Sequence, residues 1–116
     1  MDLNADVPKE VASKALEAVE ISKKSGKIKK GINEVTKAIE RGTAKLVLVA
    51  KDVNPKELVM HLPSLCDEKG IPLIPVSTKE ELGEAAGLNL PTASVAIIQE
   101  GEAKQLIKEV VSKIKA

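Results

Sequence analysis

One short stretch of this chain combines an amide, a carboxylate and an ammonium group at helical spacing. Asn33 and Glu34 stand four and three residues before Lys37, so all three side chains are expected on one solvent-facing edge of a helix. An amide donates and accepts hydrogen bonds, a carboxylate accepts from N–H groups, and an ammonium donates to O6 or N7 acceptors. Together they predict a site that can inspect the flat edge of a nucleobase.

Lysines and a glycine stand immediately before this helix, in the segment KIKKG at residues 27–31. The lysines supply cations for phosphate, and Gly31 allows a close approach to the backbone. Residues 22–41 carry seven basic and two acidic side chains, whereas the whole chain has a net charge of only +1. A concentrated positive patch on a near-neutral protein indicates a directed polyanion site.

A structural interpretation of the same helix stays open. Asn near a helix start is a common cap, and Glu in the first turn complements the helix dipole. Neither role explains the lysines upstream, and the lysine cluster therefore favours the binding interpretation.

The composition restricts the class of protein. The chain has 116 residues and one cysteine, which fits a single domain, residues 1–116, in a reducing compartment. The first ten residues are polar and acidic, unlike a signal peptide, and the apolar run at residues 46–50 is far too short to cross a bilayer. We expect a cytoplasmic protein without a membrane segment.

The chain contains no Phe, Tyr or Trp. Many proteins that bind single-stranded RNA stack bases on exposed aromatic rings, so RNA-recognition-motif and cold-shock folds are largely excluded. RNA binding by this chain must rely on shape, phosphate contacts, base-edge hydrogen bonds and aliphatic packing. The core must be built from Val, Ile, Leu and Ala.

Apolar residues at helical spacing alternate with short apolar runs along the chain. We expect helices at about residues 8–25, 33–41, 55–69, 78–86 and 102–115, and strands at about 27–30, 45–50, 71–76 and 93–98. Two prolines in the third strand place it at a sheet edge or make it irregular. The alternation predicts an α/β fold, a single-domain three-layer α/β/α sandwich around a central mixed four-stranded sheet.

Ligands bind beyond the strand ends in such sheets, and two connections there stand out. Residues 31–33 open the second helix, and residues 87–92 join the fourth helix to the last strand. Leu88 and Leu90 stand in the second connection, where polar residues are expected. They form either a buried plug or an aliphatic shelf for a flat ligand.

Four segments carry a family resemblance: KKGINEVTKA at residues 29–38, AKLVLVA at 44–50 followed by Asp52, HLPSLC at 61–66, and PTASVAI at 91–97. Their order and spacing resemble the archaeal large-subunit ribosomal protein family known as seven-Ae, over essentially the whole chain. The resemblance implies a non-enzymatic protein that binds kink-turn RNA, the sharp bend where a bulge of about three nucleotides abuts tandem sheared G·A pairs.

The resemblance also implies roles for individual residues. Asn33, Glu34 and Lys37 would contact the exposed edges of the G·A pairs, and the loop at residues 88–90 would cover the bulge and pack on a splayed base. Lys30 and Gly31 would lie against the RNA backbone. The full expected set is Lys27, Lys30, Gly31, Ile32, Asn33, Glu34, Lys37, Arg41, Lys79, Leu88, Asn89, Leu90, Thr92 and Ala93, in which Lys27, Arg41 and Lys79 are further phosphate contacts.

This chain departs from the family pattern at Asn89, where many archaeal members carry an acidic residue. The change removes a negative charge beside the RNA, so a shift in preference among RNAs is expected.

By the same resemblance, the expected partners are ribosomal RNA, box C/D and H/ACA guide RNA and ribonuclease P RNA, together with other ribonucleoprotein core proteins. The last of these RNAs would connect the protein to tRNA processing. We expect a monomer when free, with no catalytic residues, cofactor or metal site. His61 is the single histidine and is predicted to be a partly buried, hydrogen-bonded helical residue, and Cys66 is predicted to lie in the core.

Two alternatives from other classes stay open. Asp52 and residues 77–79 occupy places related to the acceptor Asp, the Ser or Thr and the Lys of a receiver-like phospho-acceptor domain. Such a domain also needs an acidic pair near the first strand to hold Mg²⁺, where this chain has Lys29 and Lys30. The other alternative is a purely protein-interaction module that uses the outer face of its helices.

Overall fold

Strand β2 (Leu46–Ala50) lies inside the sheet because its residues are all apolar and buried. It pairs in parallel with β3 (Leu73–Val76) and antiparallel with β4 (Ser94–Gln99), which in turn pairs antiparallel with β1 (Lys27–Lys30). The strand order β1-β4-β2-β3 leaves β1 and β3 at the two edges. The expected mixed four-stranded sheet is confirmed, and the proline-containing third strand is an edge strand, as predicted.

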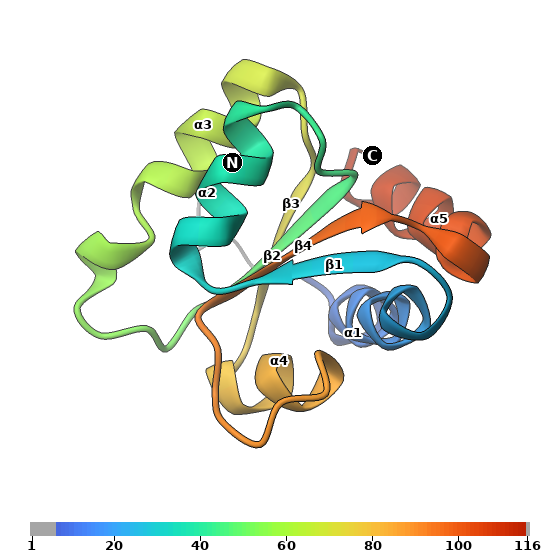
Figure 1. Ribbon diagram of the computed structural model, residues 1–116, viewed down its shortest axis with the longest axis horizontal. Helices are drawn as coiled ribbons and strands as arrows, with labels where there is room; N and C mark the ends of the chain where they lie inside the picture. Colours follow the sequence, from blue (N-terminus) through green and yellow to red (C-terminus); the bar gives the residue numbers. More distant parts are fainter. Residues whose placement is uncertain (1–6, 116) are drawn as a thin grey trace.

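Helices cover both faces of this sheet (Figure 1). α1 (Lys9–Ser25), α4 (Lys79–Ala85) and α5 (Lys104–Lys115) pack on one face, and α2 (Ile32–Glu40) and α3 (His61–Lys69) pack on the other. The structure, a computed structural model, describes residues 7–115, so the prediction about the polar first residues falls partly outside it. The predicted three-layer α/β/α sandwich is confirmed.

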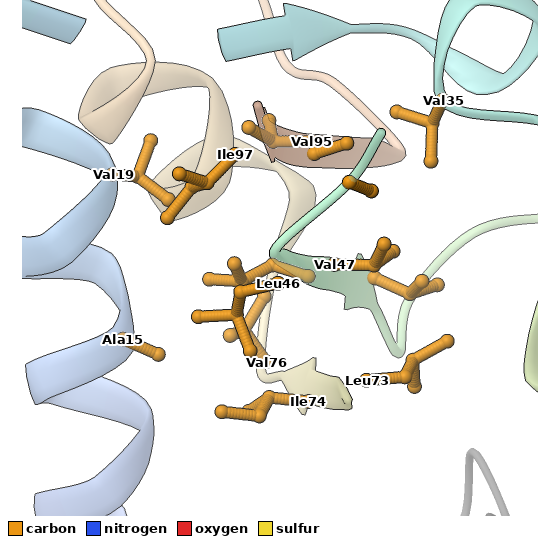
Figure 2. Packing of buried hydrophobic residues seen from close by; sticks show 14 of the residues in the cluster. Ala15, Val19, Val35, Leu46, Val47, Leu73, Ile74, Val76, Val95 and Ile97 are labelled. Atoms are coloured by element: carbon orange, nitrogen blue, oxygen red, sulfur yellow. The ribbon is translucent and has the colours of Figure 1, made fainter. Parts of the chain in front are cut away.

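The core fills both sides of the sheet because successive strand residues point to opposite faces. Figure 2 shows Ala15 and Val19 of α1 on the same side as Leu46, whereas Val47 points to the other side. All four of these side chains are fully buried. The largest fully buried side chains are Ile, Leu and Val, as the composition requires.

Strands β1, β2 and β3 all run in the same direction, because β1 and β2 are both antiparallel to β4 and β3 is parallel to β2. The carboxyl ends of these three strands and the start of β4 therefore lie at the same end of the sheet, which is not one of its two edge strands. Four connections lie at this end: the one that opens α2, the one that follows β2, the one that opens α4 and the one that precedes β4. Both connections that stand out in the sequence thus lie on the same side of the molecule.

The helix expected at residues 55–69 is wrong in its first half. The chain makes a short 3-10 turn, η1 (Lys56–Leu58), and α3 begins only at His61. Pro63 supplies the physical reason, because proline lacks an N–H and fits a helix only in the first turn, where that N–H has no intrahelical partner. A second 3-10 turn, η2 (Gly101–Ala103), precedes α5.

The burial predicted for His61 is also wrong, since its side chain is exposed at the start of α3. Its Nε2 lies 2.9 Å from the Thr36 hydroxyl, which itself donates to the Ile32 carbonyl. The single hydroxyl hydrogen is thus used, so Nε2 donates to Thr36 and links α3 to α2. Cys66 is buried as predicted, and this burial raises the pKa of its thiol to about 12.

Among the helices of residues 7–115, none combines the length and the apolar character that crossing a bilayer demands.

A network of charged side chains joins α1 to α5. Lys14 Nζ lies 2.7 Å from Glu109 Oε1 and 3.5 Å from Glu10 Oε1, and Lys113 Nζ lies 3.0 Å from Glu10 Oε1. Hydrogen bonding from Lys14 holds the pKa of Glu109 below its ordinary value. The network fastens the last helix to the first across the surface of the domain.

Replacing Glu109 with Gln is expected to lower the melting temperature slightly near neutral pH. A carboxylate with a lowered pKa stabilises the fold fully above the ordinary glutamate pKa, about 4.3, and loses this contribution as the pH falls through the lowered value. Thermal unfolding followed by circular dichroism should therefore show a deficit at about pH 7 that shrinks and disappears as the pH falls through the lowered pKa of Glu109. Glu20→Gln, at an exposed position of α1, is the matched control, and a deficit that stays the same as the pH falls would contradict the prediction.

Candidate nucleic-acid interface

Gly31 forms the turn between β1 and α2, at the sheet edge where the strands end. Its φ of +92° lies in a region that residues with a Cβ rarely adopt, and its N–H donates to the Ser94 carbonyl over 3.0 Å. A Cβ built on Gly31 would meet no atom within 4 Å. The backbone conformation therefore requires glycine, and the space beside it is open to a ligand.

α2 begins directly after this turn and presents the predicted base-reading residues. Asn33, Glu34 and Lys37 are all exposed. Lys37 Nζ and Glu34 Oε1 are 3.8 Å apart, a loose surface contact that a ligand can separate at little energetic cost. The amide, the carboxylate and the ammonium group are thus accessible together.

The first turn of α2 adds a positive pole. The first hydrogen bond within the helix runs from the Val35 N–H to the Gly31 carbonyl. The N–H groups of the preceding helical residues therefore point out of the helix end, where the dipole favours negative charge.

The capping role considered for Asn33 is wrong. Gly31 is the N-cap of α2, and no side chain makes a capping hydrogen bond there. Glu34 does lie in the first turn, so its carboxylate complements the helix dipole as the structural interpretation expected. Asn33 has no such structural role.

The α4–β4 loop (residues 86–93) faces the Gly31 turn across an open hollow of about 420 Å³. Lys30 and Gly31 line one side of this interface hollow, and residues 88–92 line the other. Leu88 is partly buried against the core, whereas the Leu90 side chain is 74% exposed. Leu88 therefore partly fits the interpretation as a buried plug, whereas Leu90 is exposed and its role as a shelf for a flat ligand stays a prediction.

Gly83 lets the loop lie close against α4. A Cβ on Gly83 would collide with the carbonyl oxygen of Leu90. The Leu88 N–H also donates to the Gly83 carbonyl over 2.9 Å. The exposed position of Leu90 therefore depends on the absence of a side chain at Gly83.

Hydrogen bonds join the two sides of the interface hollow. The Thr92 N–H donates to the Lys79 carbonyl over 3.1 Å, and the Thr92 hydroxyl donates to the Ser94 carbonyl over 3.3 Å. The same Ser94 carbonyl accepts from Gly31. Sequence reasoning missed Ser94, because a backbone carbonyl acts here and no residue type reveals that role.

The structure does not bring all of the remaining predicted residues to the interface hollow. Lys27 is at the opposite end of β1, paired with Gln99, which places it about 10 Å along the strand from Lys30. Arg41 follows the last turn of α2, about 12 Å along the helix from Asn33. The residues that are wholly or partly buried are Ile32, Lys79, Thr92 and Ala93.

The charge around Leu90 differs on its two sides. The interface hollow has Lys30 on its rim, whereas a second hollow of about 370 Å³ on the other side of the loop is lined by Glu80 and Glu84. A polyanion is therefore directed toward the Lys30 side of the shelf. The arrangement offers an apolar shelf, a cationic rim, a positive helix end and three side chains suited to base edges.

The geometry does not favour the receiver-like alternative. Asp52 Oδ1 accepts a hydrogen bond from the Lys79 N–H over 2.8 Å, so its carboxylate already has a structural partner. No group of three or more His, Cys, Asp or Glu side chains suited to a metal ion occurs among residues 7–115.

Replacing Gly83 with Ala is expected to displace the α4–β4 loop, because the new methyl group and the Leu90 carbonyl cannot both keep their places. Overpacking of this kind typically costs about 1–3 kcal/mol of unfolding free energy. Urea denaturation followed by circular dichroism measures this loss, and amide chemical shifts should change most within residues 86–93. Glu84→Ala, at the next and exposed position, is the control. A Gly83 variant as stable as this control would contradict the close packing.

Comparison with known proteins places this arrangement in a family. The chain matches the ribosomal protein L7Ae/L30e/S12e/Gadd45 family over residues 13–107, a range that includes the sheet, the Gly31 turn and the α4–β4 loop. It is also similar to a solved structure, the Giardia lamblia 15.5kD RNA binding protein, with 32% sequence identity and a TM-score of 0.91 over 99% of this chain and 98% of that chain. The family resemblance expected from the sequence is thus confirmed, and the chain belongs to the ribosomal protein L7Ae/L30e/S12e/Gadd45 family.

Proposed function

We propose that this chain is an RNA-binding protein that recognises and stabilises kink-turn motifs, in which a bulge adjoins tandem sheared G·A pairs. The observation that carries the proposal is the interface hollow, which lies between the start of α2 and the Leu90 shelf. Family membership and the similar RNA-binding protein from Giardia lamblia support RNA as the ligand.

The two sides of the interface hollow suit the two parts of a kink-turn. Asn33, Glu34 and Lys37 can donate to and accept from the base edges that sheared G·A pairs expose. Leu90 offers an aliphatic surface for an unstacked base of the bulge, which replaces the aromatic rings that the chain lacks. Lys30 and the open space beside Gly31 suit the phosphate backbone between these parts.

Binding of this kind acts by population shift. RNA samples straight and bent forms, and a protein that binds only the bent form draws the population toward it. The bend then presents the flanking RNA helices to other proteins. We accordingly propose ribosomal RNA, box C/D and H/ACA guide RNA and ribonuclease P RNA as client RNAs, with ribonucleoprotein core proteins as partners and a monomeric free state.

The proposed function predicts strong discrimination between a kink-turn hairpin and a twin whose sheared G·A pairs are replaced by Watson–Crick pairs. Gel-shift titrations should show tight binding to the hairpin and weak, salt-sensitive binding to the twin, because the twin retains only the phosphate contacts. The absence of Tyr and Trp leaves RNA as the main absorber at 260 nm, so complexes are readily quantified. Equally weak binding to both RNAs would reject kink-turn recognition.

Replacing Glu34 with Ala is expected to weaken binding to the kink-turn by about 1–3 kcal/mol while binding to the twin stays nearly unchanged. The discrimination between the two RNAs should therefore fall. Glu40→Ala also removes an exposed carboxylate, from the far end of the same helix, and is the matched control. Unchanged discrimination in the Glu34 variant would exclude a base-reading role.

Replacing Lys30 with Ala should instead weaken binding to both RNAs. The plot of log affinity against log salt concentration should lose about one unit of slope, because one phosphate contact is lost. Lys108→Ala, on α5, removes an exposed lysine far from the interface hollow and should leave the slope unchanged. A Lys30 variant with the wild-type slope would place the phosphate elsewhere.

A further inference from the structure

Asp52 follows β2 at the end of the sheet where the interface lies, but it does not line the interface hollow. Its hydrogen bond to the Lys79 N–H suggests a structural role at the interface. We propose that Asp52 is a positioning residue that fixes the α4–β4 loop in the conformation that RNA requires. The inference rests on the proposed function for the RNA step, but its structural part can be measured without RNA.

A continuous series of hydrogen bonds begins at Asp52. Its Oδ1 accepts from the Lys79 N–H over 2.8 Å, and the Lys79 carbonyl accepts from the Thr92 N–H over 3.1 Å. The Thr92 hydroxyl donates to the Ser94 carbonyl over 3.3 Å, and the Gly31 N–H donates to that same carbonyl over 3.0 Å. The series thus links four segments: the turn after β2, the start of α4, the α4–β4 loop and the Gly31 turn.

Asp52 contributes a contact that the first turn of α4 does not make for itself. Thr78 caps this helix by accepting from the Glu81 N–H over 3.1 Å, which leaves the Lys79 N–H for another acceptor. The side chain of Asp52, which follows the carboxyl end of β2, accepts the hydrogen bond from this N–H. The carbonyl to which Thr92 is bonded belongs to the same residue, so the hydrogen bond that holds the Lys79 N–H also restrains this carbonyl.

The charge of Asp52 does not explain its place beside an RNA site. A carboxylate on the edge where phosphate binds repels the ligand, whereas an Asn at this position keeps an oxygen acceptor without that repulsion. A positioning role depends on the acceptor oxygen, and a purely electrostatic role depends on the charge. The two roles therefore predict opposite results for Asp52→Ala, which weakens binding if the acceptor oxygen matters and tightens it if only the charge matters, whereas neither role predicts weaker binding for Asp52→Asn.

The expected mechanism is preorganisation. When a binding-competent loop is only partly populated, the apparent affinity falls in proportion to that population. Loss of the Asp52 contact lets the α4–β4 loop adopt other conformations. RNA then binds only the fraction of molecules in which the loop has the binding-competent conformation. The number of phosphate contacts in the complex does not change, so the salt dependence of binding should not change either.

The first test compares Asp52→Ala and Asp52→Asn in titrations with the kink-turn hairpin and its Watson–Crick twin. The Ala variant should bind the hairpin about fivefold more weakly, the size expected for the net contribution of one ordinary hydrogen bond. Its salt slope should match that of the wild type, whereas Lys79→Ala should lose about one unit of slope if Lys79 contacts phosphate. The Asn variant should bind at least as tightly as the wild type.

Hydrogen exchange of the unbound protein gives the second test. In Asp52→Ala the amides of Lys79 and Thr92 should exchange faster while those of β2 stay protected, because only the loop is released. Glu57→Ala, an exposed carboxylate of η1, is the control and should leave all of these amides unchanged. Faster exchange across the whole domain would mean a general stability role and would overturn the inference.

The outcomes separate this inference from the proposed function. If the wild type does not prefer the kink-turn, the function fails, and local exchange at Lys79 and Thr92 still decides whether Asp52 holds the loop. If the wild type discriminates and Asp52→Ala binds as the wild type does, the positioning role fails while the function stands. Tighter binding by both variants would show that the carboxylate acts only through its charge.

Discussion

The hydrogen bond from the Gly31 N–H to the Ser94 carbonyl is the constraint on which the candidate interface depends. It joins the end of an edge strand to the start of its neighbour, and the positive φ of Gly31 then turns the chain from the strand into α2. The turn made in this way directs α2 so that its first residues face the α4–β4 loop. Since Thr92 bonds to the same carbonyl, one backbone oxygen sets the separation of the two sides of the hollow.

Much of the fold could be predicted because its local signals agree with one another. The apolar run of β2, the cap at Thr78 and the prolines of β3 each indicate one structure, and the chain adopts it. The segment before α3 was mispredicted because Pro55 and Pro63 both fit a helix start, and only one helix starts there. The burial of His61 was mispredicted with it, because this residue lies exposed at the start of α3 and not within a longer helix.

The candidate interface was less accessible to prediction. Asn33, Glu34 and Lys37 could be placed on one edge because helical spacing is a local property. The contacts among Asp52, Lys79, Thr92 and Ser94 involve backbone groups of segments far apart in sequence, and they follow from strand order and direction. The division of labour between Leu88 and Leu90 depends in turn on the closeness of the loop to α4, which a glycine at position 83 permits.

The edge positions of β1 and β3 have a consequence for the behaviour of the protein in solution. An open sheet edge is a template on which a second chain can add a strand and begin an aggregate. Here one edge strand carries three exposed lysines, Lys27, Lys29 and Lys30, and the other contains Pro75, which has no N–H to offer a further strand. The cationic strand beside the interface hollow therefore also protects this aliphatic, aromatic-free protein from edge-to-edge association while no ligand covers it.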